Sequence, residues 1–158
     1  MARYSALQRP GLLVLGAALL ALPVTGGVAR AEDDDVIFKM TAGRIERIVK
    51  SFKDVTEFTE VDDNTYSFRV APLKIIIFNK GETMQLHAGF KIKERITLSR
   101  INEWNKTKRF AKAYLDKDGD PVLEADIELT GGVTEKNIKE WFKTYVICLK
   151  AFRTHISE

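Results

Sequence analysis

Three stretches of the chain repeat apolar residues at helical spacing, and each stretch follows an apolar residue and a threonine. A threonine hydroxyl can accept hydrogen bonds from the first free N–H groups of a helix, while the apolar residue before it packs on the fourth helical residue. The pattern therefore predicts three helices, which begin at Met40-Thr41, Ile96-Thr97 and Val133-Thr134.

The apolar faces of these helices predict how each one packs. The third helix is long and has the broadest apolar stripe, so we expect it to form most of the helical side of the core. The expected inward residues are Ile45, Ile48, Val49 and Phe52 in the first helix, Leu98, Ile101 and Trp104 in the second, and Ile138, Phe142, Tyr145, Val146, Leu149, Phe152 and Ile156 in the third.

Between the first two helices the apolar period changes to two, which is typical of strands. Tyr66, Phe68 and Val70 alternate with polar residues, and so do Met84, Leu86 and Ala88. Residues 73–78 (LKIIIF) are almost continuously apolar, which predicts a central strand covered on both faces. We expect three or four strands in this region.

After the second helix, two strand-like runs flank the segment Asp116–Asp120, in which Asp118-Gly119 is typical of a tight hairpin turn. In the second run Leu123, Ala125, Ile127 and Leu129 are expected to face the core. Glu124, Asp126 and Glu128 alternate with them and are expected to face solvent. The sequence thus predicts a single α+β domain, ordered helix, three or four strands, helix, two strands, helix, with an antiparallel sheet packed by helices.

Residues 1–31 have the layout of a secretory signal peptide. Arg3 and Arg9 precede the twelve-residue apolar run Gly11–Leu22. Ala29 and Ala31 are the two alanines of an A-x-A cleavage site, Ala29-Arg30-Ala31, and cleavage is expected after Ala31. Because a spanning helix needs about 20 apolar residues, a cleaved signal is favoured over an uncleaved membrane anchor. The expected location of the protein is the bacterial periplasm. After the signal peptide we expect an acidic flexible segment over residues 32–39 and a domain over residues 40–158.

Removal of residues 1–31 removes the net positive charge of the chain. The whole chain has a formal net charge of +3, but the remaining 127 residues contain 22 basic and 22 acidic residues. The apparent basicity therefore belongs to the export signal and does not indicate a nucleic-acid partner. With 45% hydrophobic and 30% charged residues, the chain has a globular composition.

The mature charge is unevenly distributed, because residues 91–114 contain eight basic and only two acidic residues. The basic segment 91–112 could attract an acidic partner, an anionic lipid or envelope polymer, or a second copy of the chain. In the alternative interpretation, Lys112 and its neighbours pair across strands with Glu124 and Asp126, which leaves no net patch. The candidate partner residues are Lys106, Lys108, Arg109 and Lys112.

Candidate catalytic chemistry is sparse, since the chain has one cysteine and two histidines. His87 and His155 lie on different elements, and Asp116–Asp120 lacks the glycine and glutamate positions of a calcium loop. Cys148 is about 10.5 Å from His155 along the expected helix, too far for an activated thiol, and is expected to be buried and inert. We therefore expect no catalytic residue, no metal and no cofactor.

The acidic row Glu124, Asp126 and Glu128 leaves a hydrolase as a remote alternative. Neighbouring carboxylates on one face of a strand are about 7 Å apart, a separation that suits an inverting glycosidase pair. No aromatic cluster for sugar binding flanks the row, and such acidic strand faces are usually only solvated.

Five short motifs follow one another between residues 101 and 134: Ile101-Asn102-x-Trp104-Asn105, Phe110–Asp116, Asp118-Gly119, Leu123–Asp126 and Gly131–Thr134. This string resembles the YbjN family, which is described as sensory transduction regulators of bacteria. The resemblance extends from about Met40 to Ile156 and implies a fold like that of type III secretion chaperones, which are often dimeric. It implies no catalytic residues. Together with the export signal, it leads us to expect a periplasmic, non-catalytic binding or adaptor protein with a protein partner or a homodimeric state, and at most peripheral membrane contact. The family-motif residues, expected to be structural, are Asn102, Trp104, Asn105, Asp118, Gly119, Gly131 and Gly132.

Overall fold

The structure is a computed structural model that describes residues 35–92 and 94–157. The predicted signal peptide and its cleavage site lie outside the described residues. Within them, the elements follow the predicted order, with four strands between the first two helices. They are β1 (Val36–Ile37), α1 (Ala42–Lys50), β2 (Val55–Asp62), β3 (Thr65–Val70), β4 (Leu73–Asn79), β5 (Thr83–Gly89), α2 (Leu98–Thr107), β6 (Lys112–Leu115), β7 (Pro121–Glu128), β8 (Val133–Thr134) and α3 (Glu135–His155).

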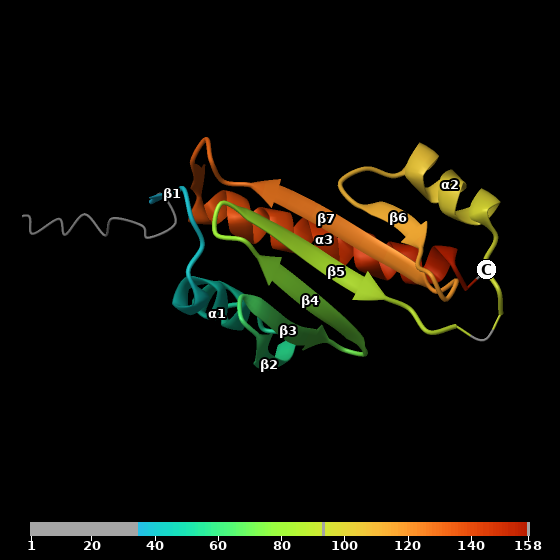
Figure 1. The fold of residues 1–158 in the computed structure, drawn as a ribbon, viewed down its shortest axis with the longest axis horizontal. Coiled ribbons are helices and arrows are strands. Elements are labelled where there is room, and N and C mark those ends of the chain that lie inside the picture. Colours follow the sequence, from blue (N-terminus) through green and yellow to red (C-terminus); the bar gives the residue numbers. More distant parts are fainter. Residues whose placement is uncertain (1–34, 93, 158) are drawn as a thin grey trace, which may run out of the picture.

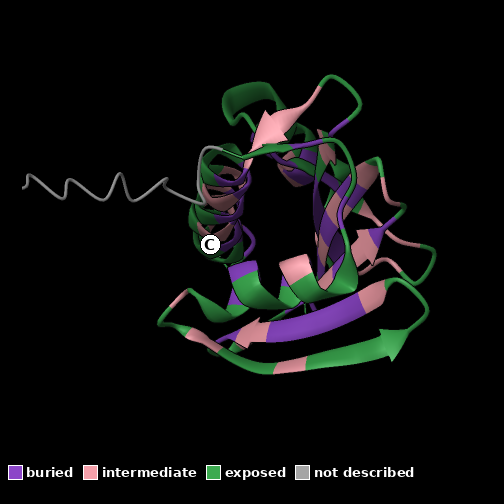
Figure 2. Ribbon diagram, turned by 90° about the vertical axis from the view of Figure 1, so that its left-hand side faces the viewer, coloured by how far each residue is buried: buried purple, intermediate pink, exposed green. Residues whose placement is uncertain are grey.

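The α+β prediction is confirmed. Six strands form an antiparallel sheet in the order β2-β3-β4-β5-β7-β6, so β2 and β6 are its two edges. The long helix α3 lies across one face of this sheet (Figure 1). Buried residues gather between α3 and the sheet, whereas exposed and half-buried residues alternate on the outward side of α3 (Figure 2).

The three predicted helix starts are confirmed in detail. The side chains of Thr41, Thr97 and Thr134 each accept a hydrogen bond from the backbone N–H three residues later. These bonds satisfy donors that the first helical turn leaves free, which explains why the helices begin at these positions.

The core joins all three helices to one face of the sheet. Ile45, Ile48 and Val49 of α1 are fully buried, and Arg47 of α1 donates to the buried Glu135 at the start of α3, at 2.6 Å. The prediction that Leu98 faces inward is wrong, because this residue is 66% exposed at the first position of α2. Phe52 lies just after α1 rather than in it, although it packs on Phe142 with ring centroids 6.0 Å apart. The residues of α3 that were expected to face inward are buried or half-buried.

The prediction that β4 is covered on both faces is wrong. β4 is a central strand, but only Leu73, Ile75 and Ile77 belong to the core, whereas Ile76 and Phe78 are half-buried on the opposite face. Figure 1 looks onto that outer face, and no helix among the described residues crosses it.

The segment before α1 is more ordered than predicted. The acidic segment was expected to be flexible over residues 32–39, but Val36 and Ile37 form β1, which pairs with β8. Ile37 is buried in the core, so its side chain fixes the chain to the domain well before α1 begins.

Candidate functional site

The outer face of the sheet carries a polar cluster centred on Glu124. Its carboxylate accepts a hydrogen bond of 2.7 Å from the Tyr114 hydroxyl, and it lies 3.0 Å from His87 Nδ1 and 3.3 Å from Lys112 Nζ. The register of the strands explains this meeting, because β7 lies between β5 and β6 and Glu124 is directly opposite both His87 and Lys112. Glu124 is only 7% exposed, so the prediction that it faces solvent is wrong.

Two opposing effects act on the pKa of Glu124. Burial is the largest single effect and raises the pKa, since a low-dielectric environment disfavours the charged form. Hydrogen bonds from His87, Tyr114 and Lys112, together with the charge of Lys112, outweigh burial and hold the pKa below its ordinary value. Burial and the same contact with Glu124 raise the pKa of Tyr114 to about 12. Glu124 is therefore a carboxylate that its neighbours keep charged.

The rest of the acidic row is also engaged by neighbours. Asp126 accepts a hydrogen bond of 2.8 Å from Gln85 and lies 3.5 Å from Lys112, while Glu128 accepts from the backbone of Thr130 at 3.0 Å. The predicted cross-strand pairing of Lys112 with Glu124 and Asp126 is thus present. These bonds account for the three carboxylates as sheet-stabilising groups.

The basic segment divides into paired and unpaired cations. Lys91 pairs with Asp120, Arg100 lies 3.9 Å from Glu103, and Lys112 belongs to the Glu124 cluster. Lys106, Lys108 and Arg109 are exposed and form no ion pair within the described part of the chain. The candidate patch therefore shrinks to these three residues at the end of α2 and in the loop after it.

An apolar groove lies where α3 passes the β2–β3 side of the sheet. Its volume is about 460 Å³, and its rim carries Lys53, Asp54 and Lys143. Ile147 belongs to the lining and is 68% exposed. The apolar lining consists of Phe52, Val55, Phe68, Val70, Phe142, Val146 and Ile147.

Sequence reasoning missed this groove, because its residues come from three separate segments of the chain. One signal was available, since Ile147 falls outside the inward stripe of α3 and is a large apolar residue at a position that a simple amphipathic helix gives to a polar one. An open apolar cavity of several hundred cubic ångströms is typical of a binding site.

The family-motif residues differ in their surroundings. Trp104 is buried and donates from Nε1 to the Ala111 carbonyl at 3.2 Å, and Asn105 bonds to the backbone of Ala113. Asn102 and Asp118 are exposed. Gly119 and Gly132 have φ values of +83° and +81°, which glycine adopts readily, whereas Gly131 is an exposed loop residue.

The remaining chemistry-bearing side chains are apart from each other. His155 packs on Trp104 with ring centroids 5.7 Å apart and contacts the Arg100 carbonyl, while His87 is in the Glu124 cluster. Cys148 is half-buried rather than fully buried; its Sγ lies 3.6 Å from the Arg109 carbonyl, and burial raises its pKa. Within residues 35–92 and 94–157, no group of three or more metal-ligating side chains is close enough to hold an ion.

Comparison with known proteins supplies the family. The YbjN family model matches residues 54–158, which is most of the chain. The chain belongs to the YbjN family. That family carries the description "Putative bacterial sensory transduction regulator". The match includes β2 to α3 and hence the Glu124 cluster, the motif residues and the groove lining except Phe52 and Lys53.

No curated protein matches the chain. None of the described helices is long and apolar enough to cross a bilayer. The regulator description of the YbjN family is consistent with an accessory role that does not depend on catalysis.

Proposed function

We propose that this YbjN protein is a non-catalytic adaptor that binds an apolar segment of a partner protein in the groove between α3 and the β2–β3 side of the sheet. The observation that carries the proposal is the groove itself, an open cavity of about 460 Å³ with an almost wholly apolar lining. Exposure of apolar side chains is unfavourable in water and is relieved when a partner covers them.

The rim supports a protein segment as the occupant. The rim has two positive charges, from Lys53 and Lys143, and one negative charge, from Asp54, beside the apolar lining. An apolar centre with a mixed polar rim is the usual composition of a protein–protein interface. The regulator description of the family supports the same role, and the chaperone-like function that the resemblance implies would use such a groove.

The proposal places the protein in the periplasm, on the strength of the signal-peptide pattern in residues 1–31. Fractionation of the cells and sequencing of the mature N-terminus test this part. A mature chain that starts at Glu32 in the periplasmic fraction supports it, and an intact N-terminus in the cytoplasmic fraction contradicts it.

Affinity purification from intact cells tests the groove. The Ile147→Glu substitution puts a charge at the mouth of the groove without disturbing the core, because Ile147 is mostly exposed. Val61→Glu is the matched control, since Val61 is another exposed apolar residue and is not part of the groove. We expect a partner to be retained by the wild type and by Val61→Glu and lost by Ile147→Glu; retention by all three contradicts the proposal.

A further inference from the structure

Phe110 lies in the loop between α2 and β6 and exposes its ring to solvent. It is 76% exposed, and its φ is +71°, a conformation that is unusual for a bulky residue. Such a conformation persists only where the surrounding structure holds it. Here the loop is fixed on both sides of Phe110, because Lys108 N–H donates to the Trp104 carbonyl at 2.8 Å and the Ala111 carbonyl accepts from Trp104 Nε1.

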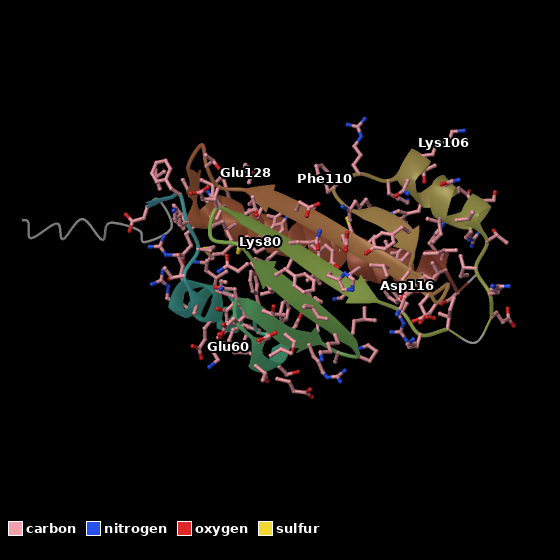
Figure 3. All side chains as sticks on the ribbon, viewed as in Figure 1. Glu60, Lys80, Lys106, Phe110, Asp116 and Glu128 are labelled. Carbon is pink, nitrogen blue, oxygen red and sulfur yellow. The ribbon has the colours of Figure 1, made fainter. Side chains whose placement is uncertain are left out.

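Three cations flank this ring in the sequence. Lys106, Lys108 and Arg109 are exposed, and the acidic residue of α2, Glu103, lies nearest to Arg100 rather than to them. Figure 3 shows Lys106 on the upper side of α2 and Phe110 at the far end of the loop that follows α2. We call Lys106, Lys108, Arg109 and Phe110 the Phe110 patch.

The combination of an outward aromatic ring and unpaired cations matches one kind of surface. Aromatic rings are favoured at the headgroup level of a bilayer, and basic side chains are attracted by anionic lipids. A soluble polyanion would attract the cations but would offer no apolar layer for the ring. We propose that the Phe110 patch docks the protein on a bilayer that contains anionic lipid, with the Phe110 ring inserted among the headgroups.

This site is separate from the partner groove. The groove lies on the β2–β3 side, whereas the patch lies beside β6, and β2 and β6 are opposite edges of the sheet. The two sites share no residue, although Cys148, which contacts the Arg109 carbonyl, is next to Ile147 in α3. Failure of one proposal does not affect the other, because their test variants share no residue.

The Phe110→Trp variant reports insertion through its change from the wild-type emission, because its new indole is at the tip of the patch while Trp104 is buried and Trp141 is half-buried. The exported form of the protein is purified. It is mixed either with vesicles that contain phosphatidylglycerol or with vesicles of pure phosphatidylcholine. With the anionic vesicles we expect a blue-shifted emission and quenching by brominated acyl chains. Sodium chloride is expected to weaken the binding, since it screens the attraction. Phe38→Trp is the matched control, an exposed phenylalanine outside the patch that is expected to show no shift.

Two further variants separate charge from insertion. Replacement of Lys106, Lys108 and Arg109 by glutamine in the Phe110→Trp background is expected to lower vesicle partitioning roughly a hundredfold. Phe110→Gly keeps the charges, removes the ring and suits the positive φ, so it is expected to weaken binding while the protein stays folded in a thermal melt. Equal binding to both vesicle types, unchanged binding of the triple variant, or binding to dextran sulfate without any to vesicles would each overturn the proposal.

Discussion

The side chain of Asn105 pairs with both backbone groups of Ala113. Its Oδ1 accepts from the Ala113 N–H and its Nδ2 donates to the Ala113 carbonyl, each at 2.8 Å. Because β6 is an edge strand, these backbone groups have no strand partner on that side, and the amide of Asn105 takes the place of one. Asn105 thus attaches α2 to the sheet.

Loss of this pairing is expected to destabilise the protein. Asn105→Ala removes two hydrogen bonds that are partly buried, so we expect the free energy of unfolding to fall by about 1–3 kcal/mol in urea melts. Asn102→Ala is the control, since Asn102 is an exposed residue of the same helix, and a change within about 0.5 kcal/mol is expected. Equal effects of the two substitutions would show that the pairing contributes nothing.

Trp104 is expected to be a core residue and not a partner contact. It is buried and packs on Phe152 with ring centroids 4.9 Å apart. Trp104→Ala should lower the free energy of unfolding by about 3–5 kcal/mol, as other large core truncations do. Trp104→Phe keeps the ring contact but loses the bond to Ala111, so a smaller loss is expected. A loss below about 1 kcal/mol for Trp104→Ala would contradict this role.

Gly132 and Gly131 provide a matched pair of substitutions. A methyl group on Gly132 would lie 2.7 Å from Val36 Cγ1 and 2.9 Å from Phe38 Cε1, and the residue has a positive φ, whereas Gly131 has open space. Gly132→Ala should therefore cost about 1–2 kcal/mol and increase amide exchange in β1. Gly131→Ala should stay within about 0.5 kcal/mol. Unchanged exchange of Val36 and Ile37 in Gly132→Ala would show that this contact does not hold β1.

Stability is expected to depend on pH through Glu124. A carboxyl whose pKa is lower in the folded than in the unfolded state stabilises the fold above its ordinary pKa, about 4.3 for Glu, and the stabilisation is lost as the pH falls through the folded pKa. Since the pKa of Glu124 is lowered by its neighbours, Glu124→Gln should be less stable than the wild type at neutral pH. The difference should shrink as the solution becomes more acidic than about pH 4.

Urea melts across this pH range measure the effect. Glu60→Gln is the control for the loss of one negative charge, because Glu60 is exposed on β2. A stability difference between Glu124→Gln and the wild type that stays constant from neutral to acidic pH would contradict the lowered pKa.

Local signals in the sequence predicted most of the fold. The threonine caps and the Asp118-Gly119 turn depend on neighbours within a few residues, and each was found where it was expected. The inward face of α3 was also predictable, because its apolar stripe is broad. The prediction for Leu98 failed because this residue is at the first helical position, where the helical period carries little information about burial.

Contacts between distant segments could not be predicted. The burial of Glu124 depends on His87 and Tyr114 standing next to it in the register of three strands, which periodicity does not reveal. The groove has the same origin, since it is formed by residues that follow α1, by β2 and β3, and by the middle of α3. The apolar run of β4 correctly predicted a central strand, but it could not show that no helix within the described residues covers the outer face of that strand.

The central claim is that the groove binds a protein segment, and site-specific photo-cross-linking in living cells tests it most directly. A photoreactive amino acid at Ile147 is compared with the same amino acid at Val61, and the linked peptides are mapped by mass spectrometry. We predict that Ile147 links to one apolar segment of a partner protein, that Val61 does not, and that a charged residue at Val146 abolishes the link. Equal products from both positions, or no product from Ile147, would contradict the account.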